Sequence, residues 1–141
     1  MRLVNSPETI DNIRVVQDYD EMLTAIKENR ETIMHWEFGN SLAPLINNKE
    51  YCCITPLLSE SGTLMNGQSL KVGDCVFCKV NGYLMVHMIW MISTAHADGR
   101  KRYLIGSSHG SMYGWTSDVY GIAKGTDVFE DVEDPPTEDL M

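Results

Sequence analysis

The sequence predicts a mainly β protein with one short N-terminal helix, an α+β arrangement whose strands form a small coiled barrel or sheet. From residue 33 onward, short apolar runs alternate with turn residues, as in all-β domains. The dipeptide Asn81-Gly82 separates two long apolar runs and is the strongest two-residue hairpin signal. Helical periodicity is confined to residues 18–31. A chain of 141 residues that is 43% hydrophobic is expected to fold as one packed domain.

Asp18 is predicted to begin the helix, because Glu21 follows three positions later as in a capping box. One apolar face follows at spacings of three and four residues and consists of Tyr19, Met22, Leu23 and Ile26. The opposite face is polar, so the helix is expected to cover part of a sheet. A short strand over residues 12–16 is expected to precede it.

The predicted hairpin consists of residues 74–80 and 83–92. Its two-residue loop sets the register, which pairs Val80 with Tyr83, Cys78 with Met85 and Val76 with His87. Both faces of the second strand are apolar, so we expect this strand to be central and covered on both sides. The only ionisable side chain between its first residue and Ile92 is His87.

Further strands are expected over residues 33–38, 50–55, 101–106 and 119–124, with loops over 59–69 and 106–116. We therefore divide the chain into three parts. Residues 1–34 form an extension packed on the core, residues 35–125 form the β domain, and residues 126–141 form an acidic tail.

The net charge of −9 and the pI near 4.7 argue against duplex nucleic acid as a partner, because binding it requires a basic face. The tail contains no Lys or Arg and includes Pro135-Pro136. Such a segment is expected to be disordered, either as a solubilising end or as a docking peptide for a basic protein. Its acidic residues are Asp127, Glu130, Asp131, Glu133, Asp134, Glu138 and Asp139.

Composition also bears on compartment and cofactors. The chain has no run of about 18 apolar residues and no apolar core of a secretory signal at residues 1–7, so we expect a cytoplasmic protein without membrane contact. Cys52, Cys53, Cys75 and Cys78 lie in predicted strands, where residues three apart point to opposite faces. This geometry favours reduced, buried thiols over a zinc site, and no cofactor is predicted.

Several short motifs, in their order and spacing, resemble those of serine peptidases related to bacterial signal peptidases and to LexA-type self-cleaving repressors. The resemblance covers roughly residues 36–125 and implies the barrel of the LexA C-terminal domain type. Its motifs are Gly39-Asn40-Ser41-Leu42-Ala43-Pro44-Leu45-Ile46, Val72-Gly73-Asp74-Cys75-Val76, Val86-His87, Tyr103-Leu104-Ile105-Gly106 and Tyr120-Gly121-Ile122-Ala123-Lys124-Gly125.

The resemblance implies that Ser41 is the nucleophile and that His87 is the base, in place of the lysine of many members. Burial would lower the pKa of His87 and keep it able to accept the Ser41 proton. Asp74, Asp118 and the loop residue His109 are candidates for a third group. Backbone N–H groups around Asn40 and Leu42 would hold the oxyanion, and an extended peptide would bind beside the site as a strand.

Two departures from the family pattern leave an alternative open. Met88 stands where an arginine commonly follows the base, and Gly106-Ser107-Ser108-His109 replaces a Gly-Asp-x-Asn loop. Ser41 also fits a turn serine and His87 a core histidine. We therefore expect a peptidase that uses a Ser41/His87 dyad to cleave a specific protein or itself. The alternative is an inactive, phage-type regulator of the same fold that binds a protein.

Lys79 is a weaker candidate base than His87. In the predicted hairpin register it lies on the opposite face and near the turn, where a lysine usually extends into solvent. A DNA-binding repressor is not expected, because the segment before residue 36 offers one helix, and a helix-turn-helix needs two.

Overall fold

The computed structural model describes residues 13–39, 41–58, 62–94 and 97–125. The predictions for Asn40 and for the acidic tail lie outside these residues. The described chain is mainly β, as predicted, with seven antiparallel strands and one short helix. The helix consists of α1 (Tyr19–Leu23) and a π-helical turn, η2 (Thr24–Glu28). The strands are β1 (Ile33–Glu37), β2 (Glu50–Pro56), β3 (Cys75–Val80), β4 (Tyr83–Ser93), β5 (Arg102–Gly106), β6 (Met112–Thr116) and β7 (Val119–Gly125).

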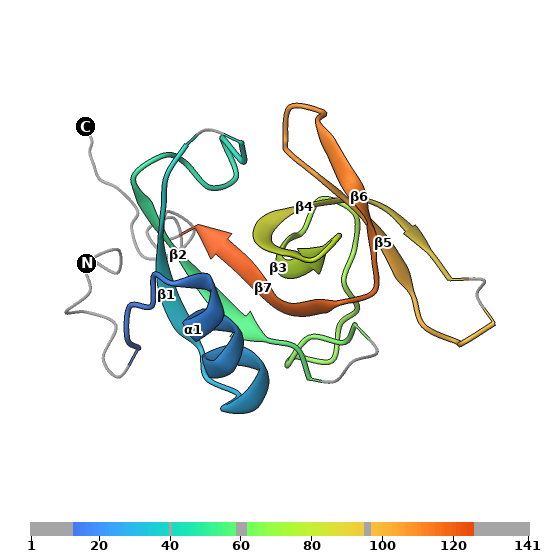
Figure 1. Cartoon of the computed structure of the whole chain (residues 1–141), viewed down its shortest axis with the longest axis horizontal. Coiled ribbons are helices and arrows are strands. Elements are labelled where there is room, and N and C mark those ends of the chain that lie inside the picture. Colours follow the sequence, from blue (N-terminus) through green and yellow to red (C-terminus); the bar gives the residue numbers. More distant parts are fainter. Residues whose placement is uncertain (1–12, 40, 59–61, 95–96, 126–141) are drawn as a thin grey trace.

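All seven strands form one sheet in the order β1-β2-β7-β3-β4-β5-β6 (Figure 1). The last strand of the chain, β7, thus lies in the middle of the sheet and pairs with both β2 and β3. No helix in the described part of the chain has the length and apolar character needed to cross a membrane.

The described strands form an open sheet, so the predicted barrel of the LexA type is not confirmed. Closure would require β6 to pair with β1, but residues 14–17 already bond to the free edge of β1. At the other end, β6 curls back toward β3 and joins it through side chains only. Thr116 Oγ1 donates to Lys79 O at 2.6 Å, and Asn81 Nδ2 donates to Tyr113 O at 3.2 Å.

The predicted hairpin is confirmed, including its register. Val80 pairs with Tyr83 and Val76 pairs with His87, and Asn81 and Gly82 both have positive φ angles, of 51° and 87°. Two successive positive φ values are what a tight turn with the right-handed twist of the strands requires. The strand β4 is central, as expected, since β3 and β5 flank it. Full coverage of both its faces was a wrong prediction, because Met91 is 54% exposed.

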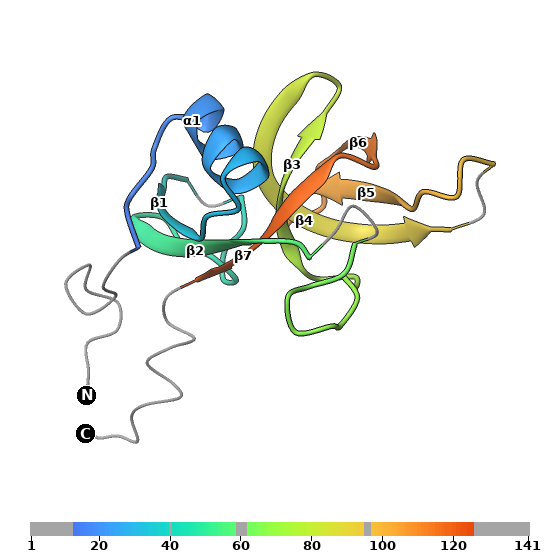
Figure 2. The ribbon, with the colours of Figure 1, turned by 90° about the horizontal axis from the view of Figure 1, so that it is seen from below.

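The helix begins where the sequence indicated. The Asp18 carboxylate accepts the Glu21 N–H at 3.0 Å, which satisfies one of the free donors of the first turn. Met22, Ala25 and Ile26 are completely buried, and η2 contacts β2 and β7. The helix therefore covers one face of the β1-β2-β7 part of the sheet (Figure 2).

Alternation along the strands produces a core on each face of the sheet. On the face covered by the helix, Ile54, Phe77 and Val86 belong to one buried cluster. On the other face, Val76, Ile89 and Ile105 belong to a second cluster. Phe77 and its neighbour Val76 are both fully buried and belong to different clusters, so β3 is covered on both sides.

Two local predictions differ from the structure. The predicted loop over residues 106–116 contains strand β6. The glycines of this segment are typical of loops, but the strand uses Gly114 at a φ of 145° and has a register shift beside Gly106. A side chain at Gly106 would meet Ser111 O at 2.5 Å, so only glycine fits there. The predicted strand over residues 12–16 is reduced to one parallel bridge between Val15 and Met34.

Strand β7 fits between its neighbours because it is built partly from small residues. A Cβ atom at Gly121 would lie 2.7 Å from Thr55 O and 3.1 Å from the Ile54 side chain. The Thr55 oxygen belongs to the backbone of β2, which cannot move without disturbing the ladder.

We predict that Gly121→Ala lowers the free energy of unfolding by about 1–3 kcal/mol, because the added methyl group forces β2 and β7 apart. Urea unfolding followed by circular dichroism measures this change. The control is Lys124→Ala on the same strand, where the side chain is exposed and little change is expected. Equal stability of Gly121→Ala and wild type would contradict the close packing of β7.

Candidate functional site

Ser41 lies in the loop that connects β1 to β2, and this loop is closed at its base. Lys49 N–H donates to Glu37 O at 2.8 Å, and Gly39 N–H donates to Asn48 Oδ1 at 2.8 Å. These bonds join the two ends of the loop directly after β1 and before β2. The segment that carries Ser41 therefore projects from the sheet edge as one unit.

Buried side chains fix the conformation of this loop. Leu42 and Ile46 are each 1% exposed and belong to the core beneath the helix. Leu42 O accepts the N–H groups of Leu45 at 2.8 Å and of Ile46 at 3.1 Å, which forms a turn. Ser41, half-buried, stands at the start of this turn. The Leu42 side chain anchors the loop, and the oxyanion role predicted for its backbone stays a prediction.

Ser108, from the loop between β5 and β6, holds the Ser41 turn from the other side. Its backbone N–H donates to Ser41 O at 2.7 Å. Its hydroxyl lies 3.1 Å from Ser41 O and 2.6 Å from Ala43 O. Since Ser41 and Ser108 are 67 residues apart, these bonds connect distant parts of the chain.

His87 lies on β4, and its half-buried ring packs against Tyr113 with the ring centroids 4.6 Å apart. Burial lowers the pKa of His87, so the imidazole is neutral at pH 7. Its Nδ1 atom is buried and has no hydrogen-bond partner in the described part of the protein. Buried ring nitrogens are normally bonded, so this atom is a candidate for interaction with a substrate or a reacting group.

The loop that bonds the Ser41 turn also bonds to β4, the strand that carries His87. Met88, the residue after His87, pairs with Gly106 of β5, the residue before Ser107. Trp90 Nε1 donates to Ser107 O at 2.8 Å and ties this loop to β4. The 107–108 segment therefore touches β4 through one residue and the Ser41 turn through the next. Among the described contacts, none joins the Ser41 hydroxyl to the imidazole, and the dyad stays a prediction.

The two predicted carboxylates each pair with a basic side chain. Asp74 accepts from Lys71 N–H at 2.9 Å and pairs with Lys71 Nζ at 3.3 Å. Asp118 pairs with Arg100 at 3.4 Å, and its backbone oxygen accepts the Lys79 N–H of β3. No contact between either carboxylate and His87 occurs among the described residues. His109 is exposed, and its backbone N–H donates to Ser107 Oγ. The oxyanion role given to Asn40 falls outside the described residues.

Two residues around the candidate site escaped the sequence analysis. Tyr113 packs on the His87 imidazole and Ser108 bonds the Ser41 turn, yet both come from a segment predicted as a plain loop. The available signal was composition alone: an aromatic residue among glycines and serines, directly before Gly114.

Two buried polar residues of β1 were also missed by the sequence analysis. His35 is 3% and Glu37 is 8% exposed, and Tyr19 stacks on the His35 ring. Burial raises the pKa of Glu37 to about 7, and its Oε1 atom has no hydrogen-bond partner among the described groups. The nearest cationic partner is His35 Nε2 at 3.7 Å, but burial lowers the pKa of that ring. Alternation in the strand places both residues on the core face, where their polarity is unusual.

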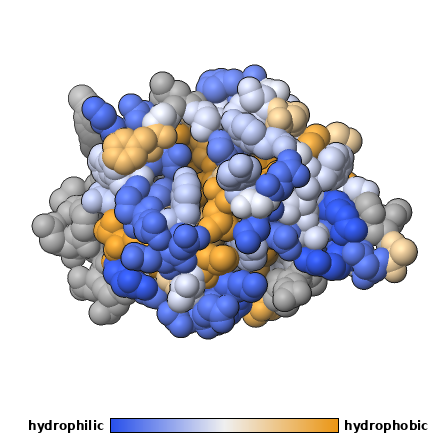
Figure 3. Space-filling model, viewed as in Figure 1, coloured by the Kyte–Doolittle hydropathy of each residue, from blue (hydrophilic) through white to orange (hydrophobic). Residues whose placement is uncertain are grey.

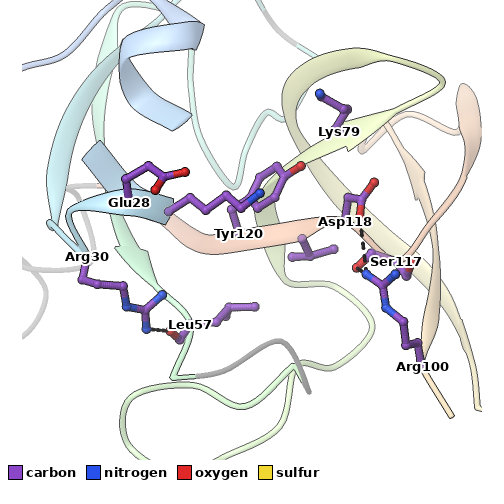
Figure 4. Close-up of a pocket in the computed structure, with 10 residues that line it drawn as sticks. Glu28, Arg30, Leu57, Lys79, Arg100, Ser117, Asp118 and Tyr120 are labelled. Carbon is purple, nitrogen blue, oxygen red and sulfur yellow. Dashed lines mark hydrogen bonds and ion pairs between the residues drawn. The ribbon is translucent and has the colours of Figure 1, made fainter. Parts of the chain in front are cut away.

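A separate pocket of about 500 Å³ opens between the helix, the end of β3 and the start of β7 (Figure 4). Its lining is rich in cations from distant parts of the sequence. These are Lys27, Arg30, Lys79 and Arg100, and they are accompanied by Glu28, Leu57, Ser117, Asp118, Val119 and Tyr120. Asp118, predicted as a catalytic residue, is part of this pocket.

The cysteines carry free thiols, and burial raises the pKa of each one. Such thiols are inert at neutral pH because the thiolate is the reactive form. Within the described ranges, no three His, Cys, Asp or Glu side chains are arranged to hold a metal ion.

Comparison of this chain with protein families, with curated proteins and with solved structures finds no match. The functional assignment therefore rests on the geometry and chemistry of the residues themselves.

We predict that Glu37 makes the protein less stable as pH rises. Its pKa of about 7 in the folded state exceeds the value near 4.5 of an exposed carboxyl, so folding takes up a proton between these values. The resulting stabilisation, about 3 kcal/mol at most, is complete below about pH 4.5 and is lost by about pH 7. Urea unfolding of wild type and Glu37→Gln across this range measures it.

Above pH 6, the free energy of unfolding of Glu37→Gln should change less with pH than that of wild type. His35 acts in the opposite sense, since its lowered pKa costs stability as pH falls below about 6.5, and it is present in both proteins. The exposed Glu28→Gln is the matched control and should leave the profile unchanged. Identical profiles for wild type and Glu37→Gln would refute this role.

Proposed function

We propose that this protein is a serine peptidase in which Ser41 is the nucleophile and His87 is the general base. The kinship with signal-peptidase-like and LexA-like enzymes, including their type of β fold, is part of the same proposal. The observation that carries it is the convergence of the Ser41 turn and β4 on residues 107 and 108 of a single loop.

The state of His87 supports this role. A general base must be unprotonated to act, and burial lowers the pKa of His87. Tyr113 packs on the ring. The ring atom Nδ1 has no hydrogen-bond partner among the described residues, so it is available to accept a proton. A core histidine with a purely structural role would instead be expected to bond through its buried nitrogen.

The anchoring of Ser41 supports the nucleophile role. Catalytic geometry requires a hydroxyl that is held in place, and buried Leu42 together with the Ser108 bonds supplies that rigidity. Neither Leu42 N–H nor Ala43 N–H is hydrogen-bonded within the described part of the protein. Such donors beside a nucleophile are suited to bind the oxyanion of a tetrahedral intermediate.

The reaction would follow the usual course of acyl transfer. The Ser41 hydroxyl attacks the peptide carbonyl while its proton passes to His87. The tetrahedral intermediate then expels the amine, which takes the proton from the imidazolium and leaves an acyl ester on Ser41. Water, deprotonated by His87, hydrolyses the ester and regenerates the hydroxyl. The substrate would be a peptide segment bound in extended form.

A second candidate function is protein binding without catalysis. Met91 pairs with Leu104, and Leu104 pairs with Trp115, so these side chains form one row across β4, β5 and β6. Met91 is 54% and Trp115 is 46% exposed, which is unusual for such large apolar groups. A row of this kind is typical of a surface that contacts another protein. Under this alternative, Ser41 and His87 are structural residues.

We predict that a fluorophosphonate probe labels wild-type protein at Ser41 and does not label Ser41→Ala. His87→Ala should slow labelling by a factor of about 10² to 10⁴, the usual loss when a general base is removed. Mass spectrometry of the labelled peptide identifies the modified residue. The pH profile of labelling should fall on the acidic side as His87 becomes protonated.

Ser69→Ala, which removes an exposed serine between β2 and β3, is the control and should be labelled like wild type. Circular dichroism and urea unfolding establish that each variant is folded. Absence of Ser41 labelling in folded wild type would favour the binding alternative. In that case Trp115→Ser should abolish association with the partner protein.

A further inference from the structure

We propose that the cationic pocket binds acidic peptide, and that its occupant is the chain's own C-terminal segment, residues 126–141. This inference does not depend on the proposed peptidase activity. The pocket consists of residues that the Ser41/His87 proposal does not use, apart from Asp118, which makes no contact with His87 among the described residues.

The first argument is the concentration of positive charge. The chain has only eleven Lys and Arg residues against twenty Asp and Glu, yet four of the eleven line this one pocket. Two carboxylates, Glu28 and Asp118, lie with them, so cations are in excess. Chance placement on a strongly acidic protein would not gather its cations in one hollow. The excess favours an anionic ligand.

The second argument is that two of these cations have no acidic partner. Lys79 makes no side-chain hydrogen bond or ion pair in the described part of the protein. Lys27 lies over the Tyr120 ring at 5.7 Å from its centroid and also lacks an ion pair there. Figure 4 shows Lys79 on β3 with its side chain directed away from the Asp118–Arg100 pair. Unpaired ammonium groups around one hollow are ready to accept carboxylates.

The other two cations of the pocket, Arg30 and Arg100, are held in place by hydrogen bonds. Arg30 donates to the carbonyls of Leu57 and Leu58, which orients its guanidinium beside the pocket. Arg100 donates to Ser117 O at 3.3 Å and to Asp118 Oδ1 at 3.4 Å. On the face viewed in Figure 3, hydrophobic surface appears as a band between hydrophilic areas. A peptide with carboxylates and a few apolar residues matches such a surface.

The C-terminal segment has the required composition and length. It contains seven acidic residues, no Lys or Arg, and the apolar residues Val128, Phe129 and Val132. It follows β7, whose first residue, Val119, lines the pocket and whose last residue is Gly125. Returning along β7 requires about 20 Å, or roughly six extended residues. Carboxylates from about Glu133 onward therefore reach the cations.

Attachment to the same chain strengthens such a contact. A short tether within one chain gives an effective concentration of about 1 mM, so even a peptide with a Kd near 0.1 mM would fill the pocket most of the time. The interaction is electrostatic and is expected to weaken as salt screens the charges.

The test uses full-length chains and a fluorescent peptide with the sequence of residues 126–141. In one variant the distal carboxylates are neutralised, by Glu133→Gln, Asp134→Asn, Glu138→Gln and Asp139→Asn. Fluorescence anisotropy should show the peptide binding this variant about tenfold more tightly than wild type, in which the attached segment competes. The added substitutions Lys27→Gln and Lys79→Gln should abolish that binding.

Lys124→Gln, on the exposed side of β7 outside the pocket, is the matched control for loss of charge and should retain binding. Failure of the peptide to bind the neutralised variant would overturn the pocket as a site for acidic peptide. Equal affinity for wild type and the neutralised variant would overturn intramolecular occupancy and indicate an acidic segment of another protein. If the weaker peptide binding of wild type depended on protein concentration, this would also overturn intramolecular occupancy. The pocket would then take the segment of a second copy of the chain.

Discussion

The whole structure depends on the insertion of β7 between β2 and β3. This last strand pairs with β2 along one edge and with β3 along the other, so it joins two parts of the sheet that otherwise have no ladder in common. The approach is close enough that Gly121 has no room for a side chain. Both hydrophobic cores include residues of β7, Ala123 on one face and Ile122 on the other. Without β7, neither core would be continuous.

The candidate catalytic residues come from the two parts that β7 unites. Ser41 follows β1 at one end of the sheet, whereas His87 lies on β4 beyond β3. The bonds of the Ser41 turn and of β4 to a common loop are therefore a consequence of how the sheet is assembled. Ser108 completes the connection because its hydroxyl and N–H both bond to the Ser41 turn. The reactivity of the site would then depend on a packing arrangement far from the reacting atoms.

Burial and charge are distributed unevenly in this acidic protein. Glu37 is buried without a full partner, and burial raises its pKa to about 7, while unpaired lysines gather around the pocket beside Tyr120. Both arrangements cost free energy in isolation, since a buried polar atom without a partner and clustered like charges are each unfavourable. The fold places these groups, and packing elsewhere in the protein offsets the cost.

Local sequence determined the elements whose signals lie within a few residues. Asn81-Gly82 sets the turn and with it the register that places His87 opposite Val76, and the Asp18 carboxylate begins the helix. Only the tertiary structure decided that the sheet stays open, that residues 112–116 pair as β6, and that Tyr113 packs on His87. The physical reason is range: turns and caps depend on neighbouring residues, whereas edge pairing and side-chain contacts depend on segments that meet only after folding.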